Sequence, residues 1–199
     1  MTKLCKASLL ISCFLLNIAY SQQSVNVLIV YYSTHGHTQA MAEAVAKGAR
    51  SVDGVTVKVL GVAEAKSEEV LAADAIIVGS PAYNANIAPP VQNFINNWPF
   101  AGAPLRDKIG AAFVTAGGIS AGEELVQMSV LHSMLIYGMI VVGGPDWRQP
   151  FGASGIVSEE PFNTEKEFGK VDAHFLAKGE ALGKRVAELA RRWKLASAR

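Results

Sequence analysis

The sequence predicts an α/β fold, a doubly wound five-stranded parallel sheet with helices on both faces. Three observations lead to this prediction. Apolar runs of strand length alternate with segments of helical periodicity along most of the 199 residues. The first run, 25–32, is almost continuously apolar, as expected of a strand buried on both faces of a parallel sheet. The loops of unusual composition all follow strands, at the edge where doubly wound sheets bind ligands.

Each element has its own pattern. In the predicted helix 38–50, Met41, Ala44 and Val45 share one face. The strand 55–60 alternates apolar and polar residues, which places it near a sheet edge. The other predicted elements are a helix at 67–72, a strand at 75–79, a helix from Pro89 through Trp98, a strand at 109–115, a helix at 121–137, a strand at 139–142 and a mostly helical segment at 164–194, in which Gly169, Gly179 and Gly183 are weak points.

The first 21 residues are predicted to be a secretory signal peptide, and residues 22–199 to form one domain. Two lysines precede an apolar run at 7–20, and Ala19 and Ser21 are the small residues that a signal peptidase reads. Cleavage after Ser21 would make the protein periplasmic or secreted, and a misassigned start would leave it cytoplasmic. The run is too short for a stable membrane span.

Cysteine and charge exclude several classes of protein. Cys5 and Cys13 both lie in the predicted leader, so the mature chain is expected to have no disulfide, no cysteine nucleophile and no cysteine-bound metal. The four histidines lack metal-like spacing with acidic residues, so no metal is predicted. With 18 basic and 17 acidic residues and no long run of like charge, nucleic acid is a poor candidate partner, and so is an acidic membrane surface.

The stretch STHGHT, residues 33–38, joins the first strand to the first helix. A helix start presents unpaired backbone N–H groups and a partial positive charge. Ser33, Thr34 and Thr38 add hydroxyl groups, Gly36 permits a tight turn, and the stretch has no lysine or arginine. These features predict a cradle that holds a phosphate through dipoles. The alternative is that Ser33 or Thr38 merely caps the helix.

The motifs missing from this turn indicate which phosphate it holds. It has neither the Gly-Lys-Ser/Thr ending of a Walker loop nor the pattern G-x-G-x-x-G. A hydroxyl-lined loop without lysine suits a mononucleotide bound without magnesium, and FMN is the candidate. A second loop of unusual composition, TAGGISAGEE, follows the fourth strand, and its Gly117 and Gly118 permit close approach of the backbone to a ligand.

Several segments, in this order, carry a resemblance to a known family: YYSTHGHT, DAIIVGSPAYNANIAPPVQNFINNW, FAGAPLRDKIGAAFVTAGGISAGEE, LIYGMIVVG and QPFGASGI. The chain resembles the flavodoxin-like family over about residues 25–192. Within that family it is most similar to the FMN-dependent NAD(P)H:quinone oxidoreductases related to tryptophan-repressor-binding protein. The resemblance implies a flavodoxin-like domain over 22–199.

The resemblance also implies site residues. The expected cofactor-binding residues are Ser33, Thr34, His35, Gly36, His37 and Thr38 at the phosphate, Pro81, Ala82, Tyr83 and Asn84 along the isoalloxazine, Thr115, Ala116, Gly117, Gly118, Ile119 and Ser120 at the pyrimidine edge, and Tyr137. No catalytic residue is certain, and Tyr137 and Phe100 are the candidates. Tyr137 replaces a histidine of the family, Phe100 takes the place of its tryptophan, and His35 replaces its usual tyrosine.

The expected function is two-electron transfer from NAD(P)H, as co-substrate, through FMN to a small quinone-like acceptor. The family also implies a homo-oligomer, either a dimer or a tetramer. Two alternatives stay open at this stage. One is a one-electron carrier of the flavodoxin type, although the three loops have few of the acidic residues that such a carrier uses to bind its partner. The other is a non-redox binding module in the exported compartment, where NAD(P)H is scarce.

Overall fold

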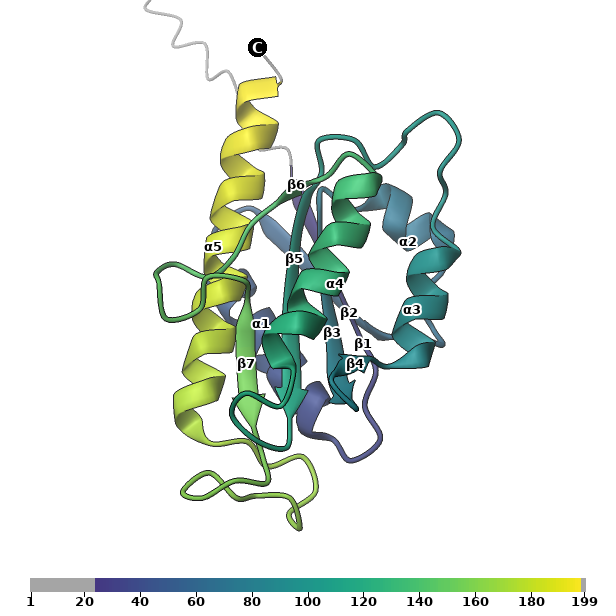
Figure 1. Ribbon diagram of the computed structural model, residues 1–199. Helices are drawn as coiled ribbons and strands as arrows, with labels where there is room; N and C mark the ends of the chain where they lie inside the picture. The colour runs from purple at the N-terminus through teal and green to yellow at the C-terminus, as the bar shows by residue number, and fades with distance from the viewer. Residues whose placement is uncertain (1–23, 198–199) are drawn as a thin grey trace, which may run out of the picture.

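The structure, a computed structural model, describes residues 24–197, so the predicted signal peptide lies outside the described residues (Figure 1). The elements are β1 (Val25–Tyr31), α1 (His37–Arg50), β2 (Val55–Gly61), α2 (Ser67–Ala72), β3 (Ala75–Tyr83), β4 (Asn86–Ile87), α3 (Pro89–Asn96), β5 (Ile109–Ala116), α4 (Glu123–Ile136), β6 (Ile140–Val141), β7 (Ala153–Ile156) and α5 (Ala173–Ser197).

The strands form a sheet in the order β2-β1-β3-β5-β6, and all four pairings along this path are parallel. This order confirms the doubly wound α/β prediction, including the edge position of β2. From β1 the chain adds β2 on one side and β3 on the other. The winding therefore reverses between β1 and β3, and the loops that follow these strands diverge there to leave a crevice.

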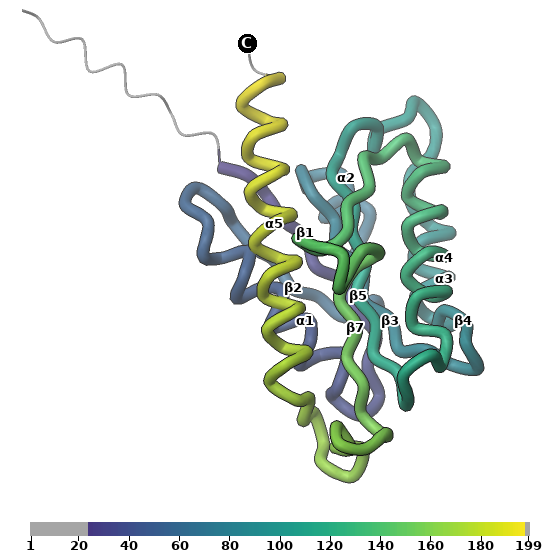
Figure 2. Tube along the Cα trace, turned by 60° about the vertical axis from the view of Figure 1, so that its left-hand side comes forward, coloured from purple at the N-terminus to yellow at the C-terminus, as the bar shows by residue number. Residues whose placement is uncertain are grey.

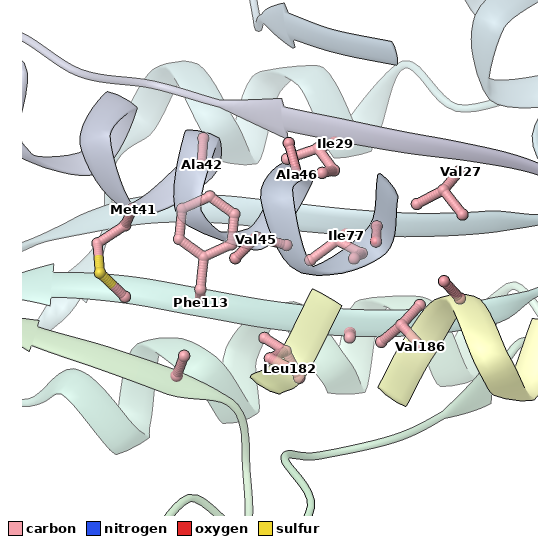
Figure 3. Packing of buried hydrophobic residues seen from close by; sticks show 14 of the residues in the cluster. Val27, Ile29, Met41, Ala42, Val45, Ala46, Ile77, Phe113, Leu182 and Val186 are labelled. Atoms are coloured by element: carbon pink, nitrogen blue, oxygen red, sulfur yellow. The ribbon is translucent and has the colours of Figure 1, made fainter. Parts of the chain in front are cut away.

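Helices cover both faces of the sheet. In Figure 2, α1 and α5 lie on one side of the strands, and α3 and α4 lie on the other. Each face has its own apolar core. On the first face Phe113 of β5 is fully buried against a layer that includes Val45 of α1 and Leu182 of α5 (Figure 3). This packing holds α1, and with it the loop before α1, firmly on the sheet.

Two of the three glycines expected to weaken the last helix, Gly179 and Gly183, instead pack α5 against α1, whereas Gly169 lies before the helix and next to Gly36. A Cβ added to Gly183 would lie 1.9 Å from the carbonyl oxygen of Val45, and one added to Gly48 would lie 1.8 Å from the carbonyl oxygen of Glu180. The two helices therefore approach closely at their glycines. The cost of glycine within a helix is offset by this contact between the helix backbones.

Three predicted boundaries were wrong. The third strand does not end at residue 79 but runs to Tyr83 and turns back into β4. The fifth strand, predicted at 139–142, is split: β6 pairs with the start of β5, and β7, which was not predicted, pairs with its end. The last helix does not begin at residue 164 but at Ala173.

The late start of the last helix has a visible cause. The Asp172 carboxylate accepts a hydrogen bond of 2.8 Å from the backbone N–H of His174, the usual arrangement of an N-cap residue. The segment 157–172 before it is therefore free to form a loop, which lies at the same end of the sheet as the start of α1 (Figure 1).

Within residues 24–197, none of the helices combines the length and the apolar character that crossing a membrane requires.

Candidate functional site

The loop between β1 and α1 begins the site. Gly36 is the N-cap of α1 and has a left-handed backbone (φ 79°), and no side chain caps this helix. A Cβ on Gly36 would lie 2.8 Å from the Cα of Gly169, so the position needs glycine for both its conformation and its space. Neither Ser33 nor Thr38 caps the helix, so the alternative of a simple cap is wrong. The N–H groups of the first turn stay available.

The three hydroxyl groups of this loop differ in their hydrogen-bond partners. The Ser33 hydroxyl is buried and has no hydrogen-bond partner within residues 24–197. Thr38 is almost completely buried and shares a 2.7 Å hydrogen bond with the hydroxyl of Thr115 at the end of β5. Thr34 bonds to the phenol of Tyr83 at 3.1 Å. A buried hydroxyl without a partner costs free energy, and a ligand that accepts a hydrogen bond from Ser33 would remove this cost.

These loops enclose a cavity of about 460 Å³ at the carboxyl ends of β1, β3 and β5. Most of the predicted binding residues line it together: Ser33, Thr34, His35, His37, Thr38, Pro81, Ala82, Tyr83, Thr115, Ala116 and Gly117. Gly36 forms the turn beside the cavity. The structure thus brings the three predicted loops to one place.

Four further residues line the cavity and were missed in the sequence: Val157, Ser158, Glu165 and Lys166. They come from the segment 157–172, whose last part had been assigned to a helix. The N–H of Gly169 donates to the carbonyl of His35 at 2.9 Å, and the Nε2 of His37 donates to the carbonyl of Glu167 at 3.2 Å. The N-cap signature of Asp172 was the signal that could have revealed this loop.

The glycine-rich loop after β5 continues outward from the cavity wall. Gly118, Ile119 and Ser120 do not line the cavity itself, and Asn84 lies in the turn between β3 and β4. The backbone N–H groups of Ile119 and Ser120 donate to Glu159 and Glu123, at 2.6 and 2.9 Å. Two of the amides expected to face a flavin are thus already bonded to carboxylates of the chain.

Tyr137 and Phe100 lie elsewhere. Tyr137 follows the last turn of α4, and its hydroxyl donates to the carbonyl of Ile95 at 3.0 Å. Phe100 packs on it, with 5.5 Å between ring centroids. Both line a second, separate cavity next to the start of β5. The length of β5 therefore separates them from the main cavity, which lies at its end. Burial raises the pKa of the Tyr137 phenol above its ordinary value.

The main cavity has the features that FMN requires. The Ser33 hydroxyl and the uncapped amides at the start of α1 can donate to a phosphate, and the helix dipole favours its negative charge. Pro81, Ala82 and Tyr83 form one wall beyond the phosphate loop. A cavity of this size with one polar end and one apolar wall fits a mononucleotide with a flat ring.

The fold is that of flavodoxins. A crystal structure described as "the flavodoxin, WrbA-like protein from Agrobacterium tumefaciens" aligns with a TM-score of 0.67, covering 85% of this chain and 99% of that chain at 24% identity. This likeness confirms the predicted flavodoxin-like arrangement of strands and helices. Identity at this level supports the fold alone.

Sequence comparisons define the family. An NAD(P)H dehydrogenase (quinone) of Azorhizobium caulinodans is 33% identical over 82% of this chain and 98% of its own length. A protein named flavodoxin, from Aquifex aeolicus, is 34% identical over 71% of this chain and 78% of its own length. The family model for NADPH-dependent FMN reductase matches residues 62–152. The chain therefore belongs to the family of the NAD(P)H dehydrogenases (quinone), as the resemblance predicted.

Replacing Ser33 with alanine should have opposite effects on stability and binding. S33A removes a buried hydroxyl without a partner, so the free energy of unfolding without ligand should stay equal or rise by up to about 1 kcal/mol. FMN affinity should fall about tenfold or more, because a hydrogen bond to a charged phosphate is lost. Urea denaturation and fluorescence titration with FMN measure the two effects.

His174→Ala is the matched control, because His174 is exposed on α5 and does not line the cavity. It should leave FMN affinity unchanged. Equal FMN affinities of wild type, S33A and H174A would contradict the phosphate assignment.

Proposed function

We propose that this protein is an FMN-dependent NAD(P)H:quinone oxidoreductase. One observation carries the proposal: a buried hydroxyl without a partner, that of Ser33, lies beside the uncapped start of α1 in the switch-point cavity of a chain of this family. Bound FMN supplies the transfer of two electrons from NAD(P)H to a quinone-like acceptor. The chain supplies the binding, the orientation and the electrostatic surroundings.

The cavity residues divide into two groups by position. Residues 33–38 hold the phosphate through amides and hydroxyls, and residues 81–83 and 115–117 flank the ring. The hydrogen bond between Tyr83 and Thr34 fixes the phenol at the edge of the cavity, where the tyrosine is 39% exposed. In this position the Tyr83 ring would pack against bound FMN and help to orient it.

Fluorescence titration followed by a turnover assay tests the proposal. The mature chain, 22–199, should quench FMN fluorescence at micromolar protein. Riboflavin has the same ring without the phosphate and should bind about tenfold more weakly or worse, since it makes no charge-assisted hydrogen bonds to the loop. The loaded protein should then oxidise NAD(P)H with benzoquinone over many turnovers. Absence of quenching would remove the enzyme function and leave a non-redox binding module.

An electron carrier is the second candidate, and two observations favour it. A relative of similar identity is named flavodoxin. The segment 157–172 also brings Glu159 and Glu165 to the site, although the three loops have few acidic residues of their own. Fast single-electron reduction without steady oxidation of NAD(P)H would identify a carrier.

We also propose that the protein is a homo-oligomer, a dimer or a tetramer, that associates through the outer face of α4. Leu125, Leu135 and Ile136 are 65%, 52% and 74% exposed on this helix. The sequence from 125 to 145 contains no Asp, Glu, Lys or Arg. The exposed side of α4 therefore carries large apolar residues near both ends, with Ser129 and His132 between them, and such a surface is suited to pack against another copy.

The same association gives a role to Phe100 and Tyr137. Phe100 is 63% exposed and lies beside Tyr137 at the end of α4, so it extends the apolar face. The two rings are remote from the cavity of their own chain. If they act on a flavin, as the family resemblance implies, it is the flavin of a neighbouring copy.

Ile136→Glu should break the oligomer, because it places a charge in the apolar face of α4. Light scattering after size-exclusion chromatography should give the mass of a dimer or tetramer for wild type and of one chain for I136E. Leu195→Glu is the control, since Leu195 is 47% exposed on α5, away from α4. A wild type that runs as a single chain would remove this part of the proposal.

Export remains our proposal for the leader. The apolar run at 7–20 and the small residues before Gln22 support a signal peptide cut after Ser21. Because β1 begins at Val25, such a cut leaves the sheet complete. N-terminal sequencing of the protein from its own host should find Gln22 first, outside the cytoplasm. Residues 1–21 found intact on protein from the cytoplasmic fraction would refute the signal peptide.

A further inference from the structure

We infer that Glu159 tunes the flavin: its carboxylate lies at the pyrimidine edge and lowers the affinity for reduced FMN relative to oxidised FMN. This inference rests on the proposed function and deepens it, because it names a residue that sets the reduction potential of the same site. Three features of Glu159 give it this role: its position, its hydrogen bond and its charge.

The position of Glu159 follows from paired backbone next to the cavity. The N–H of Val157 donates to the carbonyl of Ala116 at 3.1 Å, and the N–H of Ser158 donates to the carbonyl of Gly117 at 2.8 Å. All four of these residues line the cavity. Glu159 is the next residue along one chain segment, and Gly118 is the next along the other.

The carboxylate of Glu159 contacts this loop directly. Its Oε2 accepts a hydrogen bond of 2.6 Å from the N–H of Ile119. A Cβ on Gly118 would lie only 2.8 Å from the same oxygen, so glycine at this position is what allows the close approach. A second carboxylate, Glu123, accepts the N–H of Ser120 at 2.9 Å on the other side of the turn.

These two contacts reverse the electrostatic role expected of the loop. Free amides at the pyrimidine edge would stabilise the negative charge that flavin reduction places there. Here the N–H groups of Ile119 and Ser120 are already bonded to carboxylates. The negative charge of the Glu159 carboxylate disfavours the formation of a second negative charge on the flavin nearby. Glu159 should therefore hold the FMN reduction potential down and favour the passing of electrons to an acceptor.

Glu159→Gln isolates the charge from the hydrogen bond. The amide oxygen of glutamine can still accept the N–H of Ile119, so the loop keeps its shape while the charge is lost. The ratio of the affinity for reduced FMN to the affinity for oxidised FMN should rise about tenfold. This is near the smallest effect expected of a neighbouring charge, because Glu159 is exposed to solvent. For a two-electron couple, tenfold corresponds to a potential about 30 mV higher. Equilibration with a reference dye of known potential measures this shift.

Two further variants complete the experiment. Glu159→Ala removes both charge and acceptor and frees the N–H of Ile119 for the flavin, so its potential should rise at least as far as that of E159Q. Glu160→Gln removes the adjacent exposed charge, which has no hydrogen bond to this loop within the described chain, and should leave the potential close to wild type.

The outcomes separate this inference from the proposed function. A wild type that binds no FMN refutes the proposed function, and the inference fails with it. FMN bound by every variant at an unchanged potential refutes the role of Glu159 alone, as does a lower potential in E159Q. A weaker affinity for both redox states in equal measure would give Glu159 a purely structural role, which also overturns the inference.

Discussion

The positive-φ turn at Gly36 is the constraint on which the rest of the site depends. It starts α1 without a side-chain cap, so the first N–H groups of the helix are left for a ligand. The turn is fixed from two sides. The apolar face of α1 is packed on the sheet, and the backbone at Gly169 leaves no room for a side chain. Binding can therefore use amides whose positions are set before the ligand arrives, which lowers the cost of ordering them.

The order of the strands turns this local feature into a site. The winding reverses between β1 and β3, and the hydrogen bond between Thr34 and Tyr83 joins the two loops across the crevice that this reversal leaves. The bond between Thr38 and Thr115 ties the helix start to the end of β5. Residues separated by 77 positions in the chain thus share one polar contact at the floor of the cavity.

Much of this arrangement follows from local patterns in the sequence. Buried parallel strands have nearly continuous apolar sequences, so the sheet and its edge strand could be predicted. The three loops could be predicted because doubly wound sheets bind ligands at the carboxyl ends of their strands. The segment 157–172 was missed, because the apparent helical pattern after residue 164 outweighed the one local signal of a later start, the N-cap residue Asp172. The contact of Glu159 with Ile119 is also invisible in sequence, because it joins residues 40 positions apart through a loop of no regular structure.

The strand next to β5 is divided into two short strands, β6 and β7, and this division allows the segment between them to change in length. Each short strand pairs with its own end of β5, and after the bond of 2.8 Å from the N–H of Val142 to the carbonyl of Gly110, the segment 143–152 has no strand pairing with β5. The segment 143–152 contains Trp147, which is 85% exposed, and none of its residues lines the main cavity. Insertions or deletions between the two strands can therefore change the outline of the molecule and its contacts with other macromolecules while the pocket keeps its walls, so new associations can evolve here without loss of the chemistry.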